Sequence, residues 1–143
     1  MPKFGPALRM TLVVVCLAAP AGCGPVGNHA AIHGEVKLDG EPLTEGSILF
    51  LPATGTQGSV TGTTIKNGRY ELGAAKGPAI GHNRVEITAM RATGAKRHDP
   101  MLPPEQTADV LAQVVAARFN MASTLAVDVK PGDNQANFDV QTK

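Results

Sequence analysis

The chain has 143 residues, a formal net charge of +1 from 13 basic and 12 acidic side chains, and 43% hydrophobic residues. This length fits one domain, and the hydrophobic content excludes a chain that is disordered throughout. The near balance of charge excludes a strongly basic nucleic-acid-binding surface, so we expect no nucleic-acid partner. With 16 glycines and 11 prolines, the composition favours short elements joined by turns over long helices.

Residues 1–22 have the organisation of a secretory signal peptide. Lys3 and Arg9 give a positive start, and an apolar run from Leu12 to Ala19 follows them. Spanning a bilayer takes roughly 20 apolar residues, and this run is shorter. The pattern therefore predicts a lipoprotein export signal rather than a membrane-spanning helix.

Cys23 follows this signal directly, after the small residues Ala21 and Gly22. The arrangement predicts cleavage before Cys23 and lipidation of its sulfur, and several acyl chains give stable membrane anchoring. The position three residues before the cysteine, usually aliphatic in such sites, holds Pro20. Ordinary signal-peptidase cleavage after Ala21 is the alternative and gives a secreted protein. We therefore expect a lipid-anchored protein of the cell envelope that faces outside the cytoplasm, with secretion as the alternative.

The remainder divides into a tether and a domain. Residues 23–31 are small, polar and rich in turn formers, which predicts a tether, and residues 32–143 form the predicted domain. Alternating apolar and polar residues between turn signals predict about seven strands. Their predicted bounds are 32–38, 47–52, 59–65, 69–72, 82–90, 124–129 and 136–140.

Glycine marks several turns and one strand interior. Asp39-Gly40 predicts a two-residue hairpin link, and Asn67-Gly68 predicts a type I′ turn, because both central residues of such a turn need positive φ. Gly34 lies inside the first predicted strand, where a missing side chain fits a close backbone approach. A turn within 130–134 is expected to close a last hairpin.

The strand pattern is interrupted between residues 91 and 117. Residues 91–104 are rich in proline and charge and predict an exposed irregular excursion. Residues 105–117 carry apolar side chains at helical spacing, which predicts one short helix in the inserted loop. A candidate contact loop is formed by the basic residues of the excursion, which could meet an envelope protein or polymer: Arg91, Lys96, Arg97 and His98.

Several motifs together resemble a known family. They lie at 34–43, 46–52, 62–72, 77–85 and 129–134, and include the sequences LDGEPL, NGRYEL and KPGDN. The chain is similar to small bacterial lipoproteins with a carboxypeptidase-regulatory-like, or transthyretin-like, domain. The resemblance implies an all-β, seven-stranded immunoglobulin-like sandwich of the prealbumin type, with no assigned activity in most members. Ala116 departs from the pattern, since similar chains often have proline there.

No catalytic or cofactor motif is present in the sequence. It has no Gly-x-Ser-x-Gly elbow, no His-Glu-x-x-His and no phosphate-binding Gly-rich loop. We therefore expect no cofactor, no metal and no catalytic residue, and a non-enzymatic binding or structural module. Its predicted partners are the membrane, through the acyl chains, and an envelope protein or polymer.

Two other functions remain open. A small transthyretin-like hydrolase would need a histidine and an arginine facing each other in a polar pocket, although the chain lacks the Tyr-Arg-Gly-Ser end of hydroxyisourate hydrolases. A carbohydrate-binding module would need exposed aromatic rings. We expect the aromatic side chains after the signal to lie mostly in the core: Phe50, Tyr70, Phe119 and Phe138.

Overall fold

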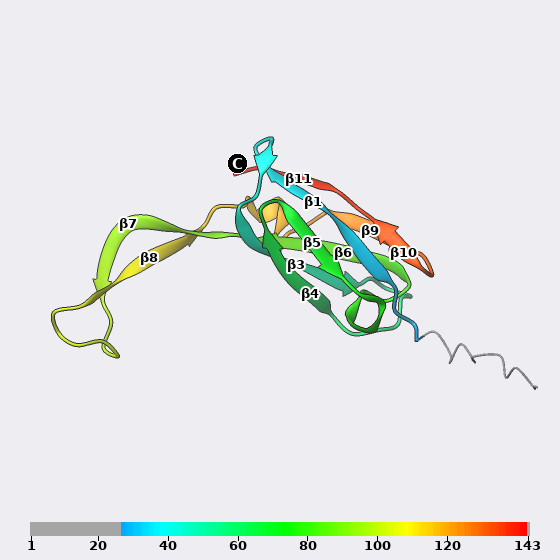
Figure 1. The fold of residues 1–143 in the computed structure, drawn as a ribbon, viewed down its shortest axis with the longest axis horizontal. Helices are drawn as coiled ribbons and strands as arrows, with labels where there is room; N and C mark the ends of the chain where they lie inside the picture. Colours follow the sequence, from blue (N-terminus) through cyan, green and yellow to red (C-terminus); the bar gives the residue numbers. More distant parts are fainter. Residues whose placement is uncertain (1–26, 143) are drawn as a thin grey trace, which may run out of the picture.

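A computed structural model describes residues 27–142 (Figure 1). The predicted signal peptide, and Cys23 with it, lie outside the described residues. The described chain is all-β, with two single-turn 3₁₀ helices, η1 (Ala74–Lys76) and η2 (Ala117–Phe119), between strands. In the part described, no helix is long and apolar enough to cross a membrane.

The main sheet is curled into a half-barrel. Its strands run in the order β10-β1-β5-β4-β3-β6-β9, and two further strands, β2 and β11, also pair with β1. Consecutive strands β9 and β10 stand at the two ends of this order, so the turn at 130–132 joins the two edges of the curled sheet. The bounds are β1 (Ala31–Leu38), β2 (Glu41–Pro42), β3 (Glu45–Pro52), β4 (Thr61–Lys66), β5 (Arg69–Leu72), β6 (Gly81–Thr88), β9 (Ala126–Val129), β10 (Asp133–Gln135) and β11 (Phe138–Val140).

The core lies inside the curl. Along β1 the side chains alternate, and the inward set of Ile32, Val36 and Leu38 is buried. Three mutually tilted rings pack through the centre, where the Tyr70 ring centroid lies 5.9 Å from that of Phe50 and 6.3 Å from that of Phe138. The period of two in the sequence therefore predicts correctly which side chains fill the core.

Both predicted two-residue turns are confirmed, and both have positive φ at their two central residues. Asp39 and Gly40 have φ of 54° and 89°, and Asn67 and Gly68 have φ of 50° and 75°. The flanking residues pair directly across each turn, β1 with β2 and β4 with β5. An aspartate and an asparagine are the non-glycine residues that best tolerate this conformation.

Gly34 is confirmed as a point of close backbone approach. A Cβ atom at this position would lie 1.8 Å from the Ala136 carbonyl oxygen. The segment that links β10 to β11 passes close to β1 here, and the Ala136 N–H donates to the His33 carbonyl at 3.0 Å. β10 and β11 pair parallel to β1 before and after this close approach. Any side chain at position 34 would therefore hold the two segments apart.

Each of the predicted strands is present with slightly different bounds, which confirms the all-β class. The immunoglobulin-like connectivity stays a prediction. The last hairpin is wrong, because its two predicted strands, 124–129 and 136–140, do not pair with each other: β9 pairs with β6, and β11 pairs with β1. The packed domain also begins before residue 32: Ala30 is 1% exposed, and its N–H donates to the Pro78 carbonyl.

The helix predicted over 105–117 is wrong. Residues Thr107–Gln113 form strand β8, which pairs antiparallel with β7 (Met90–His98) in a second, two-stranded sheet. The irregular excursion predicted over 91–104 is also wrong for the residues up to His98, because they belong to strand β7. The helical spacing arises because an exposed strand that carries Val110 and Leu111 is followed directly by Val114 and Val115, which turn onto the core.

Candidate functional site

Strands β7 and β8 form a ribbon, here called the arm, that projects from the main sheet (Figure 1). All 9 residues of β7 are exposed, and at about 3.3 Å per residue the strand extends roughly 30 Å. At the root, the Val114 N–H donates to the Ala89 carbonyl at 2.9 Å, and the Ala89 N–H donates to Gln113 Oε1 at 2.8 Å. The arm is thus fastened at its base and open to solvent along its length.

A bulge interrupts β7 halfway along the arm. The strand register shifts between Ala92 and Lys96, where three residues of β7 oppose Val110 of β8. Gly94 takes a φ of 81° within the bulge, and the Thr93 hydroxyl donates to the Val110 carbonyl at 2.9 Å. Such bulges twist a strand and disturb its outer edge. β8 has no such interruption.

The structure divides the predicted basic contact residues between two faces. Their partners on β8 place Arg91 and Arg97 on one face of the arm, and Lys96 and His98 on the other. Lys96 Nζ lies 2.7 Å from Asp109 Oδ1. The four side chains therefore form no single basic patch, although all lie on the same exposed arm.

Apolar side chains are also exposed on the arm. Met90 is 50% exposed and Leu111 is 55% exposed near the root, and Met101 in the tip loop is 91% exposed. An isolated two-stranded hairpin is only marginally stable in water. The arm therefore contributes little to the stability of the domain, and its exposed apolar side chains are available to a partner.

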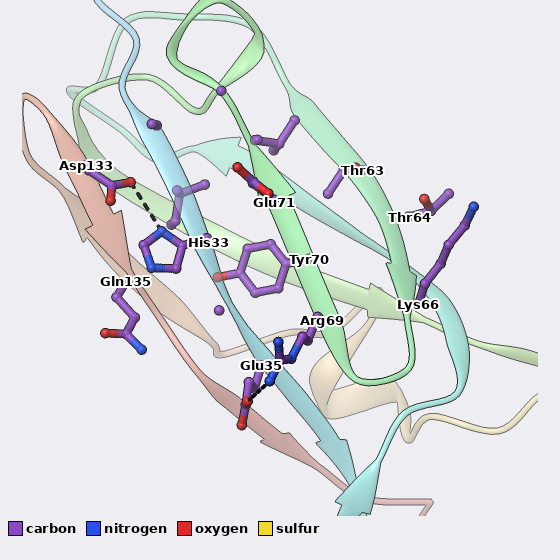
Figure 2. A pocket seen from close by; sticks show the side chains of 15 residues that line it. His33, Glu35, Thr63, Thr64, Lys66, Arg69, Tyr70, Glu71, Asp133 and Gln135 are labelled. Atoms are coloured by element: carbon purple, nitrogen blue, oxygen red, sulfur yellow. Dashed lines mark hydrogen bonds and ion pairs between the residues drawn. The ribbon is translucent and has the colours of Figure 1, made fainter.

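A second candidate site is an open depression along β10, β1, β5 and β4, with a volume of about 740 Å³ (Figure 2). Charged side chains line it in pairs. His33 Nδ1 lies 3.2 Å from Asp133 Oδ1, and an Arg69 nitrogen lies 3.7 Å from Glu35 Oε1. All four side chains are more than 40% exposed, so these pairs contribute little to stability.

Tyr70 lies beneath this depression and is part of the core. Its hydroxyl donates to the Ala136 carbonyl at 2.7 Å. Burial raises the pKa of the Tyr70 phenol well above its ordinary value. A buried hydroxyl that keeps its proton and donates to this backbone carbonyl holds the segment between β10 and β11 in place.

The histidines lie on separate elements. His33 belongs to β1, His98 to the arm, and His82 to β6, where its Nδ1 lies 2.7 Å from Asp128 Oδ1. His33 and Arg69 line the same depression, but each contacts a carboxylate rather than the other. Within residues 27–142, no group of three or more histidine, cysteine or acidic side chains is arranged to hold a metal ion.

The depression is not foreseen from the sequence because its members are distant along the chain. Residue 133 reaches residue 33 through the parallel pairing of β10 with β1. The sequence signal that points to the depression is the alternation of polar and apolar residues along β1 and β5, which places the polar side chains of His33, Glu35 and Glu71 on the outward face. The aromatic prediction is confirmed: Phe50, Tyr70 and Phe138 are buried, and Phe119 is partly buried against the core.

Comparisons with known proteins assign no family. No family model and no curated protein matches the sequence. Among solved structures, a 9R-lipoxygenase from Cyanothece PCC8801 aligns with a TM-score of 0.38 at 13% identity, over 84% of this chain and 17% of the lipoxygenase. The chain thus spans a small part of that structure. The fold and its surface define an all-β domain that carries a projecting arm.

Proposed function

We propose that the protein is a non-enzymatic, lipid-anchored module of the cell envelope that presents its arm to an envelope protein or polymer. The observation that carries this proposal is the position of the arm. The described chain starts at one end of the long axis of the molecule, and the arm extends from the other end (Figure 1). An anchor at Cys23 lies only four residues before Gly27, so the anchor and the arm would lie at opposite ends of the molecule.

The exposure of the arm supports a contact role. Ordering a segment costs conformational entropy, and a segment that buries little of its surface offsets little of that cost. Long connections with no packing of their own are usually either functional or disordered, and the arm is ordered into two paired strands. Here the arm offers the cations Arg91 and Arg97 on one face, and Met101 at its tip.

The domain folds without disulfide bonds, which is compatible with an exported location. Both cysteines of the chain, Cys16 and Cys23, precede residue 27. The folded part is therefore held by packing of its apolar core and by its strand ladders. One acyl chain gives marginal membrane binding, whereas the several chains of a lipoprotein give stable anchoring.

A transthyretin-like hydrolase is the second candidate, because His33 and Arg69 share one open depression. Their contacts with Asp133 and Glu35 speak against it, as does the exposure of these pairs. Carbohydrate binding is less favoured still, since the aromatic rings that would stack on a sugar are in the core.

Replacing the predicted lipidation site tests the proposal. We expect Cys23→Ser to move the protein from the membrane fraction to the soluble envelope fraction. The parent chain is the control, together with a Gly27→Ala chain that keeps Cys23. A Cys23→Ser protein that stays with the membrane to the same extent as the parent would refute anchoring at this residue.

A further inference from the structure

The two long edges of the arm differ in how well they are protected from further strand pairing. Among residues 27–142, no strand pairs with the outer edge of either β7 or β8. On β7 the bulge at Gly94 and the charges of Arg91 and Arg97 disfavour pairing. On β8 the 7 residues TADVLAQ run without a bulge, and the single charged side chain among them, Asp109, forms an ion pair with Lys96 of β7. The edge of β8 is therefore open to another strand.

The backbone of β8 sets which residues could pair at this edge. The Val110 carbonyl accepts from the Thr93 hydroxyl and so faces β7. In an antiparallel pair, successive residues direct their N–H and C=O groups alternately to the two sides. The outward set is therefore Thr107, Asp109, Leu111 and Gln113.

We propose that β8 pairs antiparallel with β8 of a second copy of this chain, about a twofold axis at Val110. In this register Asp109 lies opposite Leu111 of the other copy, and Thr107 lies opposite Gln113. Every residue of β8 is paired, and no like charges meet. Moving the axis to Asp109 would set two carboxylates directly opposite each other, which is destabilising. An axis at Leu111 would leave Thr107 and Ala108 unpaired.

Apolar side chains support the same register. Strand pairing places Met90, Ala92 and Leu111 on one face of the arm, and Met90 and Leu111 are half exposed. About the axis at Val110, Leu111 lies diagonal to its own copy, within reach for apolar contact. A marginal two-stranded ribbon would become a four-stranded sheet, which is more stable. The contact is isologous and closes as a dimer.

This inference deepens the proposed function, because it names a second copy as the partner of the arm. It rests on the arm being the contact element, and not on the acyl anchor. Cross-linking and dimer dissociation therefore report on strand pairing, whereas release of Cys23→Ser from the membrane reports on anchoring.

Cysteine cross-linking in the full chain tests the register. With Val110 on the axis, the two copies form a non-hydrogen-bonded pair with a Cα–Cα distance of about 4.5 Å, which suits a disulfide. In Thr107→Cys the two sulfurs would be roughly 20 Å apart. We expect mild oxidation to give a covalent dimer with Val110→Cys, and little or none with Thr107→Cys or the parent chain. Equal cross-linking of both variants, or none with Val110→Cys, would overturn the proposal.

A proline at the open edge tests pairing without a cross-link. Leu111→Pro removes an N–H that faces away from β7, so the arm itself keeps its ladder. Light scattering of the detergent-solubilised chain should show the dimer dissociation constant raised about tenfold or more. Leu111→Val, the control, should stay within about threefold of the parent. If the parent is monomeric while Cys23→Ser is still released from membranes, self-pairing is wrong and anchoring stands.

Discussion

The substitution Gly34→Ala tests the close approach of β1 to the segment between β10 and β11. A Cβ atom would lie 1.8 Å from the Ala136 carbonyl oxygen, where real Cβ atoms keep at least 3.0 Å. The two segments would have to separate by the difference, about 1.2 Å. That movement lengthens two hydrogen bonds that meet at Ala136, one from its N–H to His33 and one from the Tyr70 hydroxyl.

The cost follows from these contacts. Each hydrogen bond contributes about 1 kcal/mol, and forcing a methyl group into a packed site costs about 1–3 kcal/mol. We expect Gly34→Ala to lower the free energy of unfolding by about 3 kcal/mol. For a domain whose total stability is about 5–15 kcal/mol, the loss is large.

Urea unfolding followed by far-ultraviolet circular dichroism measures this difference. Gly73→Ala is the matched control, because Gly73 has a φ of −68° and a Cβ atom added there would meet no atom within 4 Å. That control should be neutral or stabilising by up to about 1 kcal/mol. If the free energy of unfolding of Gly34→Ala stays within about 0.5 kcal/mol of the parent, the close approach of Ala136 to β1 is not a feature of the folded protein.

The remaining predictions concern Tyr70 and the arm. Tyr70 is the only tyrosine, so phenolate absorbance reports it alone, and it should appear with unfolding rather than near pH 10. Because folding raises the pKa of Tyr70, the folded state keeps the phenol proton above pH 10, and the free energy of unfolding falls by up to about 1.4 kcal/mol per pH unit there. Tyr70→Phe should lack this fall in stability. Phenolate formation in the intact fold near pH 10 would contradict the prediction. Met90 and Gln113 pair across the arm root, so Asn-Gly in place of residues 91–112 should close a short hairpin and change the unfolding free energy by no more than about 1 kcal/mol. The same replacement should abolish chemical cross-linking, in membranes, between the protein and the partner that contacts the arm. Cross-linking that persists would place the contact elsewhere on the domain.

Much of the sheet could be predicted because local rules decide it. Asp39-Gly40 and Asn67-Gly68 allow few conformations other than primed turns, and the alternation along β1 and β6 specifies which side faces the core. Gly34 is identifiable for the same reason, as a residue without a side chain in a strand that is otherwise well filled.

The arm could not be predicted because two patterns coincide there. Val110 and Leu111 belong to an exposed strand, while Val115 belongs to the core, and together they mimic a helical period. The depression was missed for a different reason. Its His33–Asp133 pair depends on a parallel pairing between segments 100 residues apart, and local sequence carries no signal for such a pairing.

The central claim is that a lipid on Cys23 holds this β-domain at the envelope. Mass spectrometry of the N-terminal peptide from membrane-extracted protein tests it directly. Anchoring at this residue predicts a chain that starts at Cys23 and carries the added mass of acyl groups. A chain that starts at Gly22 with an unmodified thiol would contradict it.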